Sequence, residues 1–211
     1  MLPLSTELEL LVPENLEHAL ELLDRYAGNI RILAGGTDML PNLKHGLYDD
    51  GHLLSLHRLS ALTDIEITSD YIELGARVTL ETLGQDPQIN QLLPAVTDAA
   101  LSVAGPQLRA AGTLGGNLCL DTRCVYINQT HFWRSALGYC LKKDGDQCHV
   151  VKSGKRCVAA ASNDTATILS SLDAKVALQS VSGTRWVALR KFYRSDGVWN
   201  KVMQRNELLT A

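Results

Sequence analysis

The sequence predicts an α+β fold of two α/β subdomains, residues 1–57 and 58–211, with a cysteine-rich insertion at 119–157. Three observations predict it. Strand-like and helix-like segments alternate in the first 57 residues, a second such set follows, and all five cysteines fall in one stretch without a regular hydrophobic period. A chain of 211 residues is long enough to bury a core of this size.

The first subdomain is expected to run strand, helix, strand, glycine turn, helix. The expected segments are a strand at 7–12, a helix from Leu16 that stops before Gly28, a strand at 31–34 and a helix at 39–44 closed by Gly46. Strand-like residues at 53–56 complete this unit.

The second subdomain is expected to mix hairpins and helices. The expected segments are strands at 62–67 and 71–76, a helix capped by Thr79, a longer helix at 92–103, a helix from Asn163-Asp164 through Ser171, and a hairpin of 175–180 with 184–189.

Composition excludes several classes of protein. The chain is 45% hydrophobic and carries a net charge of −3, which gives no electrostatic footprint for nucleic acid or anionic lipid. No apolar run approaches the ~20 residues that span a bilayer, and the N-terminus lacks the pattern of a secretory signal. We therefore expect a cytoplasmic protein that binds neither nucleic acid nor membrane. In that compartment clustered cysteines more often bind metal than form disulfides.

Two glycine turns are candidate ligand sites. The first, Gly35-Gly36-Thr37-Asp38, lies where a strand meets a helix, and the second spans Gly112 to Asn117. Glycines allow positive φ and close approach of backbone N–H groups, which suits a diphosphate. Neither turn fits the three-glycine dinucleotide fingerprint or the P-loop. Each could equally be a tight turn without a ligand, and spacing alone leaves both interpretations open.

Four cysteines of the insertion form a candidate metal site. They are Cys124, Cys140, Cys148 and Cys157. Metal binding would supply folding free energy to a polar stretch that cannot build a core. Four thiolates suit zinc or an iron–sulfur cluster, and the absence of closely paired cysteines favours iron. Cys119 is expected to be a small buried apolar residue outside this site.

The glycine motifs carry a family resemblance. The runs Leu33–Met39, Gly105–Arg109 and Thr113–Cys119 resemble the two FAD pyrophosphate loops of the flavin subunit in the xanthine dehydrogenase and carbon monoxide dehydrogenase family. The resemblance implies a PCMH-like FAD-binding fold. The insertion is similar to that of flavin-binding beta subunits of 4-hydroxybenzoyl-CoA reductases, in which four cysteines hold a 4Fe-4S cluster.

The resemblance also implies site residues. The implied FAD contacts are Ile32, Leu33, Ala34, Gly35, Gly36, Thr37, Asp38, Met39, Val103, Thr113, Gly115, Gly116, Asn117 and Asp164. The implied cluster ligands are Cys124, Cys140, Cys148 and Cys157. No substrate-converting residue is implied, because that chemistry belongs to a partner.

The implied partners are a molybdenum-cofactor subunit and a two-iron ferredoxin-like subunit, with reduced ferredoxin as electron donor. Relatives continue for roughly another hundred residues, the length of one domain, so we expect the family's C-terminal domain to be missing. Because the glycine turns lie outside the insertion, losing a cysteine ligand is expected to leave flavin binding largely intact.

Two other functions stay open. The chain could be the flavin subunit of an aldehyde- or xanthine-type molybdenum dehydrogenase. It could also be a zinc-stabilised interaction module without a redox role.

Overall fold

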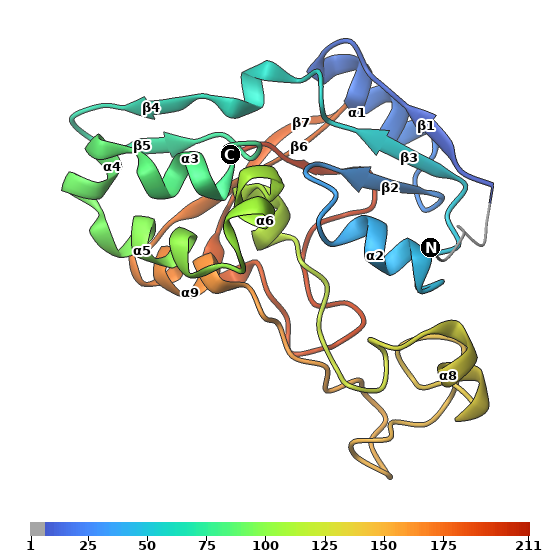
Figure 1. Ribbon diagram of the computed structural model, residues 1–211. Helices are drawn as coiled ribbons and strands as arrows, with labels where there is room; N and C mark the ends of the chain where they lie inside the picture. Colours follow the sequence, from blue (N-terminus) through green and yellow to red (C-terminus); the bar gives the residue numbers. More distant parts are fainter. Residues whose placement is uncertain (1–6) are drawn as a thin grey trace.

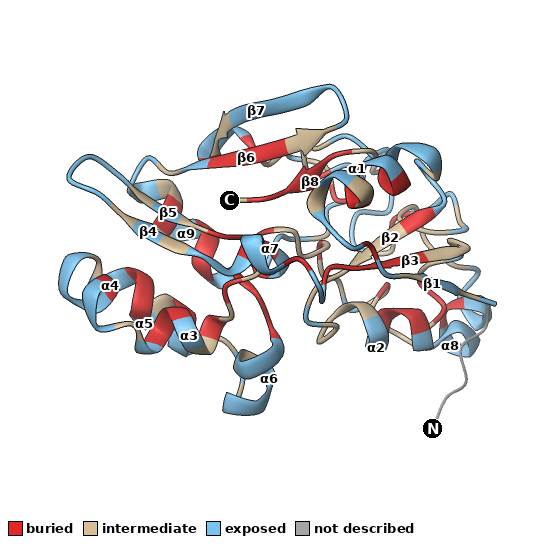
Figure 2. Ribbon diagram, turned by 90° about the horizontal axis from the view of Figure 1, so that it is seen from above, coloured by how far each residue is buried: buried red, intermediate tan, exposed pale blue. Residues whose placement is uncertain are grey.

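The computed structural model describes residues 7–211, and the first six residues of the predicted first subdomain lie outside them (Figure 1). The chain begins with a parallel sheet in the order β1 (Glu9–Leu11), β3 (His52–Ser55), β2 (Ile30–Leu33). Helices α1 (Leu16–Arg25) and α2 (Met39–Lys44) lie on opposite sides of this sheet (Figure 2). The predicted order of strand, helix, strand, turn, helix is confirmed.

Local sequence explains the limits of α1. The Asn15 side chain accepts a hydrogen bond from the His18 N–H at 2.9 Å, which caps the first turn. Leu20 and Leu23 then fall on the buried face at helical spacing. The helix ends at Arg25 with Tyr26 as its C-cap, and Gly28 follows two residues later with φ of 90°, a left-handed conformation that glycine adopts readily.

The rest of the chain combines short antiparallel strands with a group of helices. The strands are β4 (Ile65–Ile67), β5 (Ile72–Leu74), β6 (Lys175–Ser180), β7 (Gly183–Ala188) and β8 (Leu208–Leu209). The helices are α3 (Leu80–Gln85), α4 (Pro87–Leu92), α5 (Pro94–Ser102), α6 (Pro106–Ala111), α7 (Leu114–Leu118), α8 (His131–Ala136) and α9 (Asp164–Ser171). β4 pairs with β5, and the second sheet has the order β7-β6-β8.

The core has two clusters of buried apolar side chains. One cluster joins α1 to the parallel sheet. The other joins α3, α4, α5, α7 and α9 to the second sheet. Figure 2 shows β6 largely buried between neighbours while β7 is exposed at the edge. Leu208 packs in the first cluster and Leu209 in the second, so β8 connects the two halves.

Several expected boundaries were wrong. Leu62 lies in a 3-10 turn (Ser60–Thr63), not in the strand that begins at Ile65. The helix expected at 92–103 is α5 (Pro94–Ser102), which begins two residues later than expected because Leu92 ends α4 and Pro94 starts the new helix. The second glycine turn is the first turn of helix α7.

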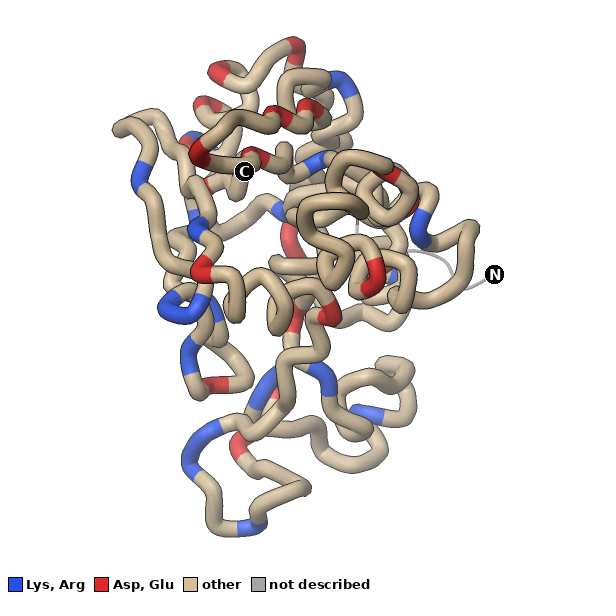
Figure 3. Tube along the Cα trace, turned by 90° about the vertical axis from the view of Figure 1, so that its left-hand side faces the viewer, with Lys and Arg blue, Asp and Glu red and all other residues tan. Residues whose placement is uncertain are grey.

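The insertion projects from the body beside α2 and contains helix α8 (Figure 1). It holds seven Lys or Arg and three Asp, so its charge opposes that of the whole chain. Figure 3 shows basic positions along these projecting loops at the bottom of the molecule. Within residues 7–211, none of the helices has the length and apolar character needed to cross a bilayer.

Candidate functional site

A cavity of about 800 Å³ opens between the parallel sheet, α6, α7 and the insertion. Both glycine segments line it, and so do residues just before β8. The expected FAD contacts that line the cavity are Ile32, Ala34, Gly35, Gly36, Thr37, Asp38, Met39, Val103, Thr113, Gly115, Gly116 and Asn117. The structure therefore brings twelve of the fourteen expected residues together in the lining of this one cavity.

The first glycine segment connects β2 to α2 and offers free donors. Gly36 has φ of 74°, which an L side chain rarely adopts. Among residues 7–211, no protein acceptor receives a hydrogen bond from the main-chain N–H groups of Gly35 through Asp38. The N-terminus of α2 follows at once and favours negative charge. This loop can therefore bind an anionic group through its backbone.

The second glycine segment has a different role. The Thr113 side chain accepts from the Gly116 N–H at 3.1 Å and caps α7. The Leu114 and Gly115 N–H groups donate to the carbonyls of Val78 and Ala76 at 2.9 and 2.8 Å. These three amides are thus used inside the protein, so this part of the second segment shapes the cavity wall and offers no free N–H groups of its own.

The two glycine segments touch. A Cβ on Gly35 would overlap the carbonyl oxygen of Ala111, at the end of α6. A Cβ on Gly112 would lie 3.6 Å from the Thr37 hydroxyl. Glycine at position 35 is therefore required by packing, because no side chain fits between the two segments.

Asp38 places a carboxylate beside the free donors, and Arg123 neutralises it. The Arg123 guanidinium forms an ion pair with Asp38, which also accepts from the Asn42 side chain at 2.9 Å. Burial lowers the pKa of Arg123, as expected for a cation partly removed from water. The pair keeps an uncompensated negative charge away from the anion-binding loop.

Leu33 and Asp164 lie outside the cavity lining. Leu33 packs behind the loop, where a Cβ on Gly36 would approach its Cδ1 at 3.3 Å. Asp164 is exposed at the start of α9 and lies 3.5 Å from the Asn117 side-chain amide. Asn117 itself accepts from the Thr165 hydroxyl at 2.7 Å, so it connects α7 to α9. The structure gives Asp164 contact with the cavity through Asn117 only.

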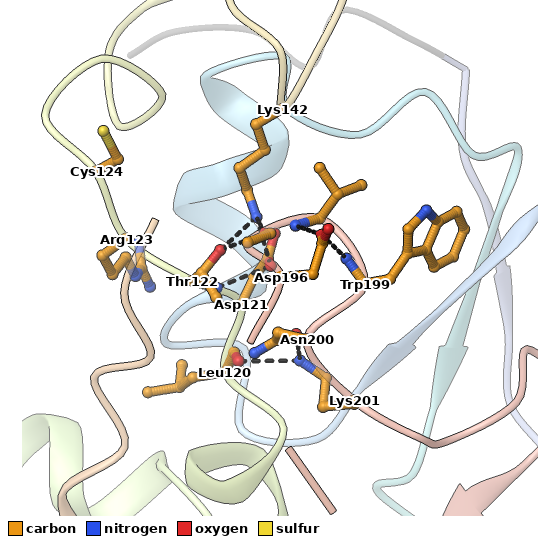
Figure 4. A network of polar contacts seen from close by, with 12 residues as sticks. Leu120, Asp121, Thr122, Arg123, Cys124, Lys142, Asp196, Trp199, Asn200 and Lys201 are labelled. Carbon is orange, nitrogen blue, oxygen red and sulfur yellow. Dashed lines mark hydrogen bonds and ion pairs between the residues drawn. The ribbon is translucent and has the colours of Figure 1, made fainter. Parts of the chain in front are cut away.

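Sequence reasoning missed a polar wall opposite the glycine loops. Lys142 donates to Asp121, Thr122 and the Gly197 carbonyl at 2.8, 2.6 and 2.6 Å (Figure 4). Lys201 donates to the Leu120 carbonyl at 3.1 Å. Burial lowers the pKa of Lys201. These contacts join segments between 20 and 81 residues apart in the chain, so no local spacing signal could reveal them.

Next to Lys201, two further groups complete this wall. The Asn200 side-chain nitrogen is buried without a hydrogen-bond partner among the described residues, and it lines the cavity. Cys119 also lines the cavity, and burial raises the pKa of its thiol to about 11, with Lys201 opposing the shift. Cys119 therefore stays a protonated thiol at neutral pH, separate from the other cysteines.

The remaining four cysteines surround a second, small cavity of about 20 Å³. Cys124, Cys140, Cys148 and Cys157 all line it, together with Lys142 and Ile127, which also line the large cavity. Burial raises the pKa of Cys157, and the Lys142 charge opposes that shift. Within residues 7–211, no three His, Cys, Asp or Glu side chains lie close enough together to share one metal ion.

Comparison with known proteins assigns this architecture. Residues 6–211 match the family model "FAD binding domain in molybdopterin dehydrogenase". The chain is 29% identical over 182 residues to the xanthine dehydrogenase FAD-binding subunit of Escherichia coli O157:H7, covering 86% of this chain and 49% of that protein. It is 25% identical over 206 residues to the nicotinate dehydrogenase FAD-subunit of Eubacterium barkeri, covering 97% and 57%.

A solved structure agrees. The fold matches reconstituted CO dehydrogenase from Oligotropha carboxidovorans with a TM-score of 0.74 and 25% identity, covering 97% of this chain and 57% of that one. The chain thus spans about half the length of the curated relatives it matches. With its two glycine segments at one cavity and the family model matched from end to end, this chain belongs to the FAD-binding domains of the molybdopterin dehydrogenase family.

Proposed function

We propose that this chain holds FAD in the large cavity and a 4Fe-4S cluster on its four insertion cysteines, and that it relays electrons within a molybdenum-containing reductase. The assembly would be of the 4-hydroxybenzoyl-CoA reductase type, with reduced ferredoxin as donor and substrate chemistry on a molybdenum-cofactor subunit. A two-iron ferredoxin-like subunit would be the further partner.

One observation carries the proposal: the two cavities share a wall. Lys142 and Ile127 line both the glycine-walled cavity and the cysteine-lined cavity. Two redox groups placed there would face each other across a single layer of side chains. That arrangement suits transfer of electrons more than conversion of a substrate.

The cavity residues fit FAD. The free N–H groups of Gly35 through Asp38 suit its diphosphate, and Arg123 offsets the nearby Asp38 carboxylate. Apolar walls such as Leu80 and Val103 suit its aromatic rings. When bound, FAD supplies one- and two-electron chemistry, while the protein supplies binding and orientation.

The cysteine cavity fits a cubane cluster in its donor chemistry. Four thiols and no carboxylate line it, and thiolates are the usual ligands of iron–sulfur clusters. In a cubane each cysteine binds a different iron, so the sulfurs need not converge on one point. The absence of a convergent three-residue group among residues 7–211 therefore weighs against a single zinc ion more than against a cluster.

A second candidate is the flavin subunit of an oxidative molybdenum dehydrogenase. It is favoured by the names of the matched relatives, which include xanthine and nicotinate dehydrogenase subunits. The four cysteines around one cavity favour the first candidate, because they add a redox site. A zinc-stabilised interaction module would retain the insertion but leave the large cavity without a role.

Anaerobic purification of the chain together with its natural partners tests these proposals. We expect about one FAD per chain, and about four iron and four acid-labile sulfides per chain in addition to those of the two-iron partner subunit, as a 4Fe-4S site requires. FAD with no iron beyond that of the partner's two-iron clusters would leave the flavin assignment and remove the cluster from this chain. Zinc without iron and without flavin would overturn both.

A further inference from the structure

Arg134 is a buried cation that connects the insertion to the C-terminal end of α2, the helix that follows the first glycine loop. It lies in α8, and its side chain is 2% exposed. Its Nη2 donates to the carbonyls of His45 and Gly46 at 2.9 and 2.8 Å, and its Nε donates to the Gln129 carbonyl at 3.3 Å. Arg134 does not line the large cavity, so any effect on a ligand there must pass through other residues.

The carbonyls of His45 and Gly46 lie at the C-terminal end of α2. His45 is the C-cap of α2, and Gly46 follows it. Carbonyls at a helix C-terminus have no partner within the helix and carry partial negative charge. The guanidinium bonds both of them through Nη2 and at the same time bonds the Gln129 carbonyl through Nε, whereas a lysine ammonium has a single donor nitrogen.

The insertion holds α2 at its other end as well. Arg123, next to the cysteine Cys124, pairs with Asp38 at the N-cap of α2. Beyond the helix, Lys143 pairs with Asp49 at 2.5 Å. The helix that begins directly after the free N–H groups is therefore anchored at both ends by cations of the insertion.

We propose that Arg134 is a positioning residue for the flavin site, which couples order in the cysteine insertion to the affinity of the first glycine loop for FAD. The inference rests on FAD binding in the large cavity. It replaces the expectation that the insertion and flavin binding are independent, because the insertion lines that cavity and holds α2.

Flavin titration of the full chain tests the coupling. Arg134→Met should raise the Kd for FAD at least tenfold, measured by quenching of flavin fluorescence. Arg134→Lys should give an intermediate Kd, since lysine keeps the charge but has one donor nitrogen in place of the two that Arg134 uses. The control Arg156→Met removes an exposed arginine of the same insertion and should change Kd less than twofold. A folded Arg134→Met protein with the parental Kd would overturn the proposal.

A second measurement needs no variant. Coupling is reciprocal, so FAD binding to the parent protein should slow amide hydrogen exchange in α8 as well as in the glycine loops. Residues of α8 do not line the cavity, so direct contact cannot explain such protection. Protection of the loops with unchanged exchange in α8 would refute the coupling while leaving FAD binding intact. A parent protein that binds no FAD would instead refute the proposed function.

Discussion

Gly35 and Gly36 are neighbours in sequence, and the fold constrains them for different reasons. Gly36 is held by its backbone conformation, with φ of 74°. Gly35 is held by contact, since any Cβ would overlap the Ala111 carbonyl oxygen. The first constraint shapes the donor loop, and the second keeps the two glycine segments against each other.

Gly35→Ala should therefore separate the segments. We expect it to destabilise the fold by about 1–3 kcal/mol, the usual cost of overpacking, and to weaken FAD binding more than tenfold. Urea unfolding and flavin titration measure the two effects. Gly105→Ala is the control, because a Cβ there meets only the Gln107 side chain at 3.7 Å. Equal behaviour of the two variants would contradict the packing argument.

Residue identity predicted the positions of the two glycine segments that line the cavity, but not what their amides do. The pattern Gly-Gly-Thr-Asp indicated positive φ and free N–H groups, and Gly36 bears this out. The similar run at Gly115-Gly116 has its amides bonded inside the protein. The difference arises because Val78 and Ala76 lie beside the second segment, a contact that only the tertiary fold creates.

Among the elements, the short helices were hardest to predict. Helix α7 contains two glycines and has poor intrinsic propensity. It forms because the Thr113 hydroxyl caps it and the turn between β5 and α3 accepts its first N–H groups through the Val78 and Ala76 carbonyls. Longer elements with clear periodicity, such as α1 and the β6–β7 hairpin, lie where the sequence predicted them.

Thr113→Ala should show how far α7 depends on its cap. We expect a loss of about 1 kcal/mol, typical of a removed N-cap, and weaker FAD binding because α7 lines the cavity. The control Asp86→Ala removes the cap of α4, where Asp86 accepts from the Gln88 and Ile89 N–H groups. It should cost similar stability and leave the flavin Kd unchanged. A flavin effect of equal size in both variants would count against a local role for α7.

At the scale of the whole molecule, β8 completes both cores, and an ion pair on a buried carboxylate holds the chain before it. Arg185 on β7 donates to Glu207 at 2.5 and 2.8 Å, and Glu207 is buried. These hydrogen bonds from Arg185 lower the pKa of Glu207 below its ordinary value of 4.5. The two-residue strand was not predicted, because only its long-range partners define it.

The ion pair between Arg185 and Glu207 should make the folded protein less stable as the pH falls. Because the folded pKa is lowered, the contribution is present above about pH 4.5 and is lost as pH falls through the folded value. Glu207→Gln should cost roughly 1 kcal/mol near neutral pH, a modest figure because Arg185 is partly exposed. The difference from the parent should shrink in more acidic solution. Urea unfolding across the acidic range measures it, and a constant difference would contradict the assignment.

Lys142 and Ile127, which line both cavities, have a consequence for the rate of electron transfer between them. Groups on either side of side chains that line both cavities need no swinging arm and no diffusing carrier between them. For the two proposed cofactors, the tunnelling rate would depend on their separation, the driving force and the reorganisation energy. The slow steps of electron transfer would then lie outside this domain, where electrons enter from the donor and leave to the partner subunits.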